Sequence, residues 1–389
     1  MSLPDWSLLA DHVIVEILGN LPVLEAIQCS QVCRRWHSAF GSEKFWRKPK
    51  FIEFRGQPEQ TAQLSFCQNY SKFSTHLSLT IDQSVPVNRQ LSLKFLELIS
   101  GAATFAQMRS ISVAFVGENP LFYAGQEYVD SLRQLFASSK LPILRILDLS
   151  SLQILFTDDL ILELSRCAPV LRRLDIQNKQ LVCKISPECV LQLIENCPNL
   201  DDLRLFYKSL SDAALVRLSA AERAPMRHLS IQCRRMDKWE SQDLTTDAWL
   251  RLTGQWPNLI VTLKFDHTCP PDIIYAIMKP AVPVAHLFLE TFTDCYQQLE
   301  TAAKLYANRL RKVVIQCQPS EELDGALLRL VSQAVHLREL HVLCILDQPT
   351  IDSILQQHPR MAAEGCYTLR YNLDPHPWVS DEILDRIWI

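Results

Sequence analysis

One short apolar pattern recurs along most of the chain. An apolar residue is followed by two variable residues and then by two apolar residues separated by one, as in the copies that begin at Leu144, Leu171 and Leu200. The first residues of the ten apolar-x-apolar triplets fall at positions 77, 111, 147, 174, 203, 229, 263, 287, 313 and 340. Their commonest spacing is 26 to 29 residues. A fixed period of this length predicts a stack of similar units in which each unit buries its apolar face against its neighbours.

The segments between the copies carry helix signals. Apolar residues recur at helical spacing, as at Val190, Leu191 and Ile194. A Ser or Thr precedes several of these stretches, where its side-chain oxygen can accept a hydrogen bond from a free N–H group of the first turn. The predicted cap positions are Thr157, Ser186, Ser211 and Thr246. One strand and one helix at this period are typical of a leucine-rich repeat, so we expect a curved solenoid with parallel strands on the concave face and helices outside.

Alternation along each strand predicts which side chains face a partner. The triplet residues are expected to point into the stack, together with Cys233, Cys317 and Cys344, while the residues before, between and after them point onto the open face of the sheet. The candidates for substrate binding on that face are Asp148, Arg173, Asp175, Arg204, Phe206, His228, Lys264, Phe288 and His341. Their charges are mixed, so they do not predict the charge of a partner.

Two insertions and the tail break the period. Residues 117–125 and 234–245 lengthen single repeats, and residues 374–389 follow the last one. Irregular insertions on a rigid scaffold are favoured places for binding, which makes Trp239 a further candidate for substrate contact. The alternative is that such aromatic side chains cover packing gaps or the ends of the stack.

The first fifty residues have a different pattern. Val13, Ile14, Ile17, Leu18 and Leu21 form an apolar stripe at helical spacing. A second amphipathic stretch follows, with a short third piece ending at a tryptophan, and its apolar residues are Leu24, Ile27, Val32, Cys33, Trp36, Phe40 and Trp46. Three short helices make a poor independent core. Some of these side chains therefore need a partner, which is either the neighbouring domain of the same chain or another protein.

This N-terminal block resembles an F-box. The matching residues are Leu9, Val13, Ile14, Ile17, Leu18, Leu21, Val32, Cys33, Arg34, Trp36 and Trp46. The resemblance implies binding to the adaptor Skp1, and through it to cullin-1 and a RING subunit of a ubiquitin ligase. It implies that the contacts to Skp1 are made by Leu9, Ile14, Ile17, Leu18, Leu21, Val32 and Trp36. An F-box followed by leucine-rich repeats resembles the F-box/leucine-rich-repeat family across nearly the whole chain.

These observations predict an α/β chain with four parts. Residues 1–50 form a three-helix F-box, and residues 51–70 form a linker and the start of the solenoid. Residues 71–373 hold about ten to eleven leucine-rich repeats, and residues 374–389 form a C-terminal cap or tail.

Composition excludes several classes of function. The net charge of the 389 residues is −4, so no basic field favours nucleic acid or an anionic membrane surface. No stretch reaches eighteen uncharged apolar residues, and the first residues lack the basic and apolar segments of a signal peptide. We therefore expect a protein of the cytoplasm or nucleus, or of both.

Motifs for catalysis and cofactor binding are missing from the sequence. The nine glycines lie more than five positions apart, which excludes a dinucleotide-binding GxGxxG, a P-loop and a GxSxG nucleophile turn. The thirteen cysteines are scattered without a Cys-x-x-Cys pair, so a metal site is not predicted. We expect no catalytic residue, no cofactor and no metal.

The resemblance predicts a substrate-recognition subunit of an SCF (Skp1–cullin–F-box) ubiquitin ligase. Such a subunit promotes ubiquitination of a bound protein by proximity and does no covalent chemistry itself. The alternative hypothesis is a ligase-independent leucine-rich scaffold or inhibitor, in which the N-terminal helices only cap the stack. A third is a GTPase activator with an exposed arginine, such as Arg173 or Arg204.

Overall fold

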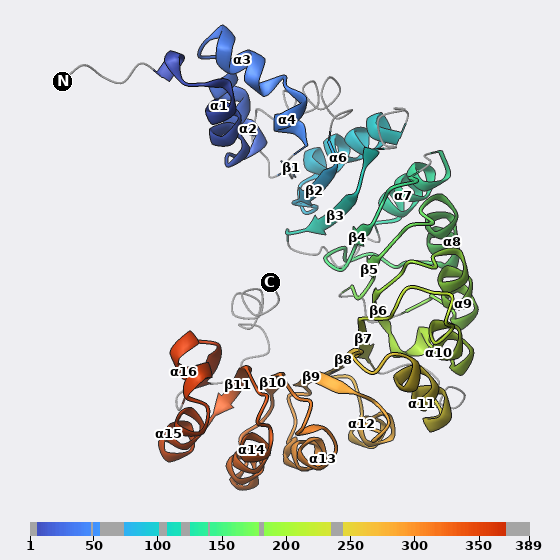
Figure 1. The fold of residues 1–389 in the computed structure, drawn as a ribbon, viewed down its shortest axis with the longest axis vertical. Helices are drawn as coiled ribbons and strands as arrows, with labels where there is room; N and C mark the ends of the chain where they lie inside the picture. The colour runs from blue at the N-terminus through green and yellow to red at the C-terminus, as the bar shows by residue number, and fades with distance from the viewer. Residues whose placement is uncertain are drawn as a thin grey trace, which may run out of the picture. The chain divides into compact units, whose positions relative to one another are not determined.

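The computed structural model describes residues 6–47, 50–54, 74–100, 107–117, 125–138, 141–178, 183–234 and 244–370. The chain divides into two compact units, Met1–Leu200 and Asp201–Ile389, and each is described by itself (Figure 1). Most of both predicted insertions, Trp239 and the tail 374–389 lie outside the described residues, so the predictions made for them stay predictions.

The N-terminal block consists of short helices. They are η1 Trp6–Leu8, α1 Asp11–Gly19, α2 Val23–Ser30, α3 Arg34–Phe40 and α4 Glu43–Trp46. The second amphipathic stretch is thus two helices, because the chain becomes extended at Cys33. The break allows both helices to bury their apolar side chains, Ile27 on α2 and Trp36 and Phe40 on α3.

The rest of the first unit alternates strands with helices. Its elements are β1 Lys50–Phe54, β2 His76–Ile81, α6 Pro86–Ser100, β3 Ser110–Phe115, α7 Gln126–Ser138, β4 Ile146–Asp148, α8 Asp158–Cys167, β5 Arg173–Asp175 and α9 Pro187–Asn196. Neighbouring strands pair in parallel, and the predicted triplet positions are in register, with Leu77 opposite Ile111, Ile111 opposite Leu147, and Leu147 opposite Leu174. Strand β1 begins at the end of the predicted F-box and continues into the segment predicted as a linker and the start of the solenoid.

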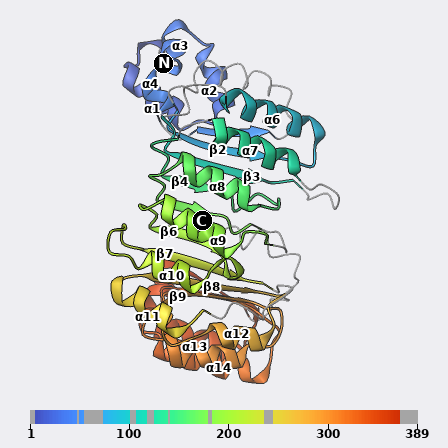
Figure 2. The same cartoon turned by 90° about the vertical axis from the view of Figure 1, so that its right-hand side faces the viewer.

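The second unit continues the same alternation. Its elements are β6 Asp202–Phe206, η4 Tyr207–Ser209, α10 Asp212–Leu218, β7 His228–Cys233, α11 Thr246–Gln255, β8 Ile260–Asp266, α12 Pro271–Ile277, β9 Val284–Glu290, α13 Tyr296–Tyr306, β10 Lys312–Gln316, α14 Glu321–Gln333, β11 Glu339–Ile345, α15 Gln348–Gln357, α16 Pro359–Glu364 and β12 Tyr367–Arg370. All described strand pairs are parallel. In each unit the helices that alternate with strands lie together on one side of the strands (Figures 1 and 2). The predicted α/β fold class is confirmed.

One strand pair has an irregular register. Leu229 of β7 pairs with Val261 of β8 and not with Leu263, the first predicted triplet residue of β8. On the next strand, Val261 pairs with Val284 but Thr262 pairs with His286, so β9 has one extra residue at this point. Such a bulge shifts the pairing of the residues that follow by one position relative to the neighbouring strand.

Triplet residues form the core, and helix caps connect the repeats. Leu147, Leu174 and Leu229 are completely buried, as are the inward cysteines Cys233, Cys317 and Cys344. Hydroxyl oxygens cap two helices at predicted positions: Ser186 accepts a hydrogen bond from the backbone N–H of Cys189 (3.1 Å), and Ser211 accepts one from that of Ala214 (3.2 Å).

The other two predicted caps differ from the structure. The cap of α11 is Thr245, one residue before the predicted Thr246, and its hydroxyl accepts from the backbone N–H of Ala248 (3.3 Å). Thr245 is extended, and its own N–H and hydroxyl donate to Asp212 of the preceding repeat (2.9 and 2.6 Å), which fixes it as the cap. Thr157 precedes α8 as predicted but makes no side-chain cap bond.

Candidate partner-binding surfaces

Helix α1 divides its apolar residues into two stripes. Ile14 and Leu18 are completely buried inside the N-terminal block. Val13 and Ile17 lie one helical turn apart on the adjacent stripe and are half-buried, as is Leu21 just beyond the helix. Ile17 and Leu21 therefore have apolar surface available to a partner. Ile14 and Leu18, which were predicted to contact Skp1, contribute to such a surface only through the packing beneath it.

An aromatic cluster holds the block together. Trp46 packs edge-on against Phe40 and Phe45, with ring centroids 5.3 and 5.2 Å apart, and its indole N–H donates to the carbonyl oxygen of Phe40 (2.8 Å). Trp36 is buried, and its indole N–H donates to the carbonyl of Trp6 (3.3 Å). The two tryptophans of the motif are thus core residues, and Trp36 also fixes the chain segment that precedes α1.

Three apolar side chains of this block are strongly exposed. The exposed fractions are 75% for Leu8, 74% for Val32 and 59% for Trp6, and Leu9 is half-buried beside them in sequence. The sequence predicted Leu9 and Val32 but missed Trp6 and Leu8, because the 3-10 turn that contains them carries no periodic signal. Exposed apolar side chains on a small block are typical of a surface that another protein covers.

The same block also packs on its own chain. Helix α2 contacts β1, and the hydroxyl of Thr75, just before β2, donates to the carbonyl oxygen of Arg47 (2.9 Å). The first alternative left open by the sequence is therefore realised in part, because α2 packs on the first strand. The half-buried stripe of α1 and the exposed Leu8 and Val32 remain available to another protein, so the second alternative stays a prediction.

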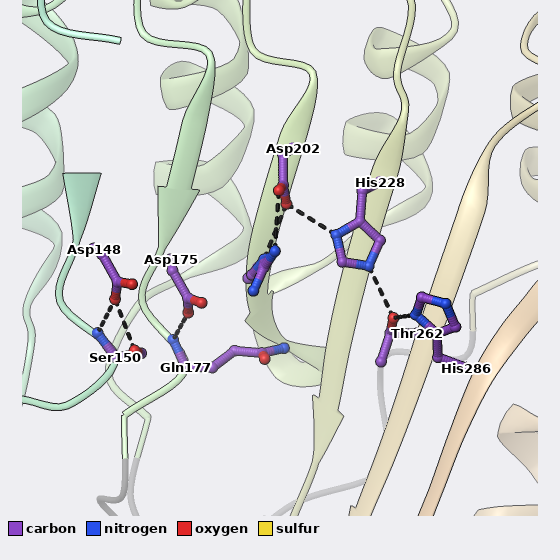
Figure 3. A network of polar contacts seen from close by, with 9 residues as sticks. Asp148, Ser150, Asp175, Gln177, Asp202, His228, Thr262 and His286 are labelled. Carbon is purple, nitrogen blue, oxygen red and sulfur yellow. Dashed lines mark hydrogen bonds and ion pairs between the residues drawn. The ribbon is translucent and has the colours of Figure 1, made fainter. Parts of the chain in front are cut away.

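On the open face of the first unit, carboxylates shape the ends of two strands. Asp148 at the end of β4 accepts hydrogen bonds from the backbone N–H and the hydroxyl of Ser150 (3.0 and 2.7 Å), and buried Asp175 at the end of β5 accepts from the backbone N–H of Gln177 (3.1 Å) (Figure 3). Arg173 is half-buried on β5. Asp148 and Asp175 thus support the loops that follow their strands.

The second unit begins its open face with a buried charge cluster. Both guanidinium contacts from Arg204 to the Asp202 carboxylate are 3.1 Å long, and Nδ1 of His228 lies 3.1 Å from the same carboxylate. Burial raises the pKa of Asp202, but the hydrogen bonds from His228 and Arg204 lower it by a larger amount, so the net pKa lies well below its usual value. Asp202 is therefore ionised, and Nδ1 of His228 donates to it.

This cluster continues across two more strands. Nε2 of His228 lies 2.8 Å from the hydroxyl oxygen of Thr262 on β8, and that oxygen lies 3.1 Å from Nδ1 of His286 on β9 (Figure 3). Burial, followed by the nearby His228 and Lys312, lowers the pKa of His286 to about 4. His286 is therefore neutral at physiological pH.

Aromatic rings and cations alternate elsewhere on this face. The guanidinium carbon of Arg234 lies 5.1 Å from the ring centre of Phe206, and the ammonium nitrogens of Lys264 and Lys312 lie 5.6 and 5.9 Å from that of Phe288. Phe206 and Phe288 are buried, while Lys264 is half-buried. The two phenylalanines thus support the cations by cation–π contact, and they leave little ring surface for a partner.

The last strands carry a further pair of polar contacts. Lys312 on β10 forms an ion pair with Glu339 on β11 (2.7 Å), and Nδ1 of His341 lies 3.0 Å from the hydroxyl of Thr368 on β12. His341 is buried, and burial together with Lys312 lowers its pKa. The nine predicted substrate residues that the structure describes therefore include buried members, Asp175, Phe206, Phe288 and His341, whose access to a partner is limited.

The candidates predicted from the sequence do not include four residues of this face: Thr262, His286, Lys312 and Glu339. Each comes directly before the first residue of a triplet, as do Asp202 and His228. The rule that this position faces outward therefore contained the signal for all four.

A buried carboxyl lies at the far ends of these strands. Arg234 and Asp266 form an ion pair (2.9 Å) with both side chains largely buried. Next to them, burial raises the pKa of Glu290 to about 7, although Lys264 lowers it. A half-charged carboxyl near neutral pH is unusual, and this one lies beside an ion pair.

Asp202, His228, Thr262 and His286 form a hydrogen-bonded row, called the polar row below. This row can form hydrogen bonds with a partner but is poorly placed for covalent chemistry. Asp202, His228 and Thr262 follow the order of a catalytic triad, with a carboxylate, an imidazole and a hydroxyl. Thr262, however, is only 3% exposed, and its oxygen is shared with His286. Burial raises the pKa of Cys233 well above its usual value, which disfavours the thiolate. Among the described residues, no three His, Cys, Asp or Glu side chains are grouped to hold a metal ion.

No described helix combines the length and the apolar character needed to cross a membrane.

Known proteins share both parts of this architecture. The F-box domain model matches residues 6–48. The chain is 30% identical to F-box/LRR-repeat protein 8 of Homo sapiens and 32% identical to that of Bos taurus, and each match covers 95% of this chain and 96% of the relative. F-box/LRR-repeat protein 21 of Mus musculus is 25% identical over 86% of this chain and 76% of its own length.

These matches agree with the sequence motifs. The segments 118–125, 280–285 and 375–378 indicate a resemblance to F-box/LRR-repeat protein 8, and the identity over nearly the full length confirms it. The helical block, the regular strand–helix repeats and the relatives lead to one assignment: the chain belongs to the F-box/leucine-rich-repeat family.

Proposed function

We propose that this chain is the substrate-recognition subunit of an SCF ubiquitin ligase, in which the N-terminal block binds Skp1 and the repeats bind a protein substrate. The general role of the family, a non-catalytic receptor in SCF complexes, supports the proposal. The observation that carries it is an apolar surface left uncovered on a folded F-box.

The adaptor surface in this proposal differs from the sequence prediction in its detail. Leu9, Ile17, Leu21 and Val32 remain proposed contacts, and the exposed Leu8 joins them. Ile14, Leu18 and Trp36 act from beneath by holding these side chains in place. Fully burying a Leu or Val side chain stabilises a complex by about 1.5–3 kcal/mol before the costs of association are subtracted.

The substrate surface is proposed on the open faces of the strands. Half-buried polar side chains that are already oriented by neighbours can read the hydrogen-bonding groups of a partner at little entropic cost. In the second unit, Arg204, His228 and Lys264 have this character, while Arg173 and Asp148 have it in the first. Through Skp1 the receptor would join cullin-1 and a RING subunit, and the substrate would be ubiquitinated by proximity in the cytoplasm or nucleus.

Co-expression with Skp1 followed by size exclusion tests the first half of the proposal. The expected result is a stoichiometric complex, with the chain expressed alone being less soluble because its apolar surface is uncovered. A monomeric chain that ignores Skp1 would contradict the ligase role and leave the scaffold or inhibitor hypothesis.

A further inference from the structure

In the polar row of the second unit, the donor and the acceptor of each hydrogen bond can be assigned by starting from the ionised Asp202. Asp202 is an ionised acceptor that also binds Arg204, so the proton between Asp202 and His228 is on Nδ1 of the imidazole. When His228 is neutral, its Nε2 has no proton and must accept. The hydroxyl of Thr262 then donates to Nε2 of His228, at 2.8 Å.

The direction continues to His286. Because the hydroxyl proton of Thr262 points at His228, the oxygen of Thr262 accepts from Nδ1 of His286, 3.1 Å away. The low pKa of His286 keeps its ring neutral, so its single proton is used in this bond. Nε2 of His286 then carries a bare lone pair. Within the described part of the chain, no hydrogen-bond partner is found for this nitrogen, and the residue is half-exposed.

Protonation of His228 exchanges the donor and acceptor roles along the row. Both ring nitrogens of a cationic His228 donate, Nδ1 to Asp202 and Nε2 to the oxygen of Thr262. The hydroxyl proton of Thr262 must then turn to another acceptor. Thr262 is buried, and among the described residues its hydroxyl is hydrogen-bonded to the two rings only. A buried hydroxyl without an acceptor is unfavourable, so the proton turns to Nδ1 of His286. The proton of His286 moves to Nε2.

The surroundings of His286 oppose an added proton on that ring. His286 is faced by Lys312 of β10, by Arg311 just before it and by His228, while Glu339 of β11 acts in the opposite direction. His228 contacts the Asp202 carboxylate instead. From β8, Lys264 is two residues beyond Thr262. The ring centroids of the two histidines are 6.0 Å apart, so a positive charge on both at once is unfavourable.

We infer that Nε2 of His286 is a recognition position on the substrate face, an acceptor that selects an uncharged N–H or O–H donor of the bound protein and that becomes a donor when His228 is protonated. The inference rests on the proposed function for the identity of the partner, but the row itself does not. A phosphate or carboxylate of a partner is disfavoured at this position while the row is in its neutral state, because two sets of lone pairs would face each other.

The row is tested without any partner by imidazole nitrogen NMR of the full chain labelled with ¹⁵N-histidine. His228→Gln and His286→Gln assign the signals. At pH 8 the expected result is a protonated Nδ1 and a bare Nε2 for His286. As the pH falls, the proton of His286 is expected to move to Nε2 with the same midpoint at which His228 becomes cationic. A protonated Nε2 at pH 8, or a His286 tautomer that is unchanged while His228 titrates, would overturn the inference.

Variants of the central threonine sharpen the test. Thr262→Val removes the hydroxyl that links the rings, so the tautomer of His286 should no longer follow His228, whereas Thr262→Ser should preserve the coupling. Thr291→Val is the matched control, because Thr291 directly follows β9 and is also buried, and its hydroxyl has no hydrogen-bond partner among the described residues. Coupling that survives in folded Thr262→Val would overturn the role of Thr262, and the wild-type titration decides the matter if that variant does not fold. None of these outcomes depends on Skp1, so a chain that fails to bind Skp1 would refute the ligase role and leave the row standing.

Discussion

The N-terminal block and the open face of the second unit expose opposite kinds of surface. The block buries its aromatic rings against one another and leaves Leu8 and Val32 in water. The open face holds Asp202, His228 and Thr262 half-buried or buried and already bonded to one another. An uncovered apolar surface gains free energy from any partner that removes it from water. A row of oriented polar groups gains little net free energy but penalises a partner with mismatched groups.

The difference suggests a division of roles within one receptor. Under the proposed function, the block would supply affinity for a constant partner, and the open face would supply selectivity for a variable one. Each surface can therefore be altered without the other, and substitutions should separate the two.

The largest effect is expected from the aromatic core of the block. Trp46→Ala removes three contacts at once, namely the packing on Phe40 and on Phe45 and the hydrogen bond to the carbonyl of Phe40. A loss of about 3–5 kcal/mol is expected for a large aromatic residue in a core. Hydrogen exchange should show the loss over residues 6–47, while the second unit keeps its protection. Trp6→Ala, at an exposed position, serves as the control and should cost less than ~1 kcal/mol.

A smaller effect is expected on the polar row. Asp202→Ala leaves the guanidinium of Arg204 and Nδ1 of His228 half-buried without their acceptor. The free energy of unfolding should fall by about 2 kcal/mol in denaturant titrations at pH 7. Asp130→Ala is the matched control, because Asp130 pairs with Arg133 on the exposed surface of α7 and should cost less than ~0.5 kcal/mol. Equal losses in the two variants would show that the row is no more than surface charge.

An effect of similar size that depends on pH is expected at Glu290. Its pKa is raised from 4.5 to about 7 in the folded chain, so between these pH values the folded state binds more protons than the unfolded state. The stability of the wild type therefore falls as the pH rises through this window. Glu290→Gln stays neutral and should be more stable than the wild type at pH 8 by about 2 kcal/mol, less than the full shift implies because the side chain is partly exposed.

Thermal melts at pH 5 and pH 8 check this prediction. The variant should gain much less at pH 5, where the folded wild type is already protonated. Glu97→Gln, at an exposed position on α6, controls for the loss of a negative charge. A gain of the same size at both pH values would contradict the raised pKa.

Much of the fold was predictable because its repeats are dictated by a local pattern. Leu147, Leu174 and Leu203 are buried as the triplet rule requires, since alternation along a strand places them inward whatever the neighbours do. The rule holds for β8 and β9 as well, where Leu263 and Leu287 are completely buried, but it does not predict how two strands pair. The bulge opposite Thr262 depends on the register of β8 against β9, which no single segment of sequence encodes.

The sequence predicted residues for the proposed adaptor site, but it did not predict which of them lie at the surface. Ile14 and Ile17 are chemically alike and only three positions apart, yet one is buried and the other half-exposed. Which stripe of α1 remains available depends on how α3 and α4 pack on it, and this packing is decided by Phe40, Phe45 and Trp46 together. The exposed Leu8 was missed because exposure leaves no mark in sequence periodicity.

The most direct test of the division of roles is the affinity of Skp1 for two double variants of the full chain. Leu8→Glu with Val32→Glu changes the exposed surface of the block, where the side chains are 75% and 74% exposed. Leu250→Glu with Val335→Glu makes the same changes of residue type at positions 54% and 70% exposed on the repeats. The account predicts that the first variant binds Skp1 at least ~100-fold more weakly, or about 2.7 kcal/mol, with its fold intact, while the second binds within about twofold of the wild type. Equal binding by both would contradict the claim that this uncovered apolar surface is the adaptor site.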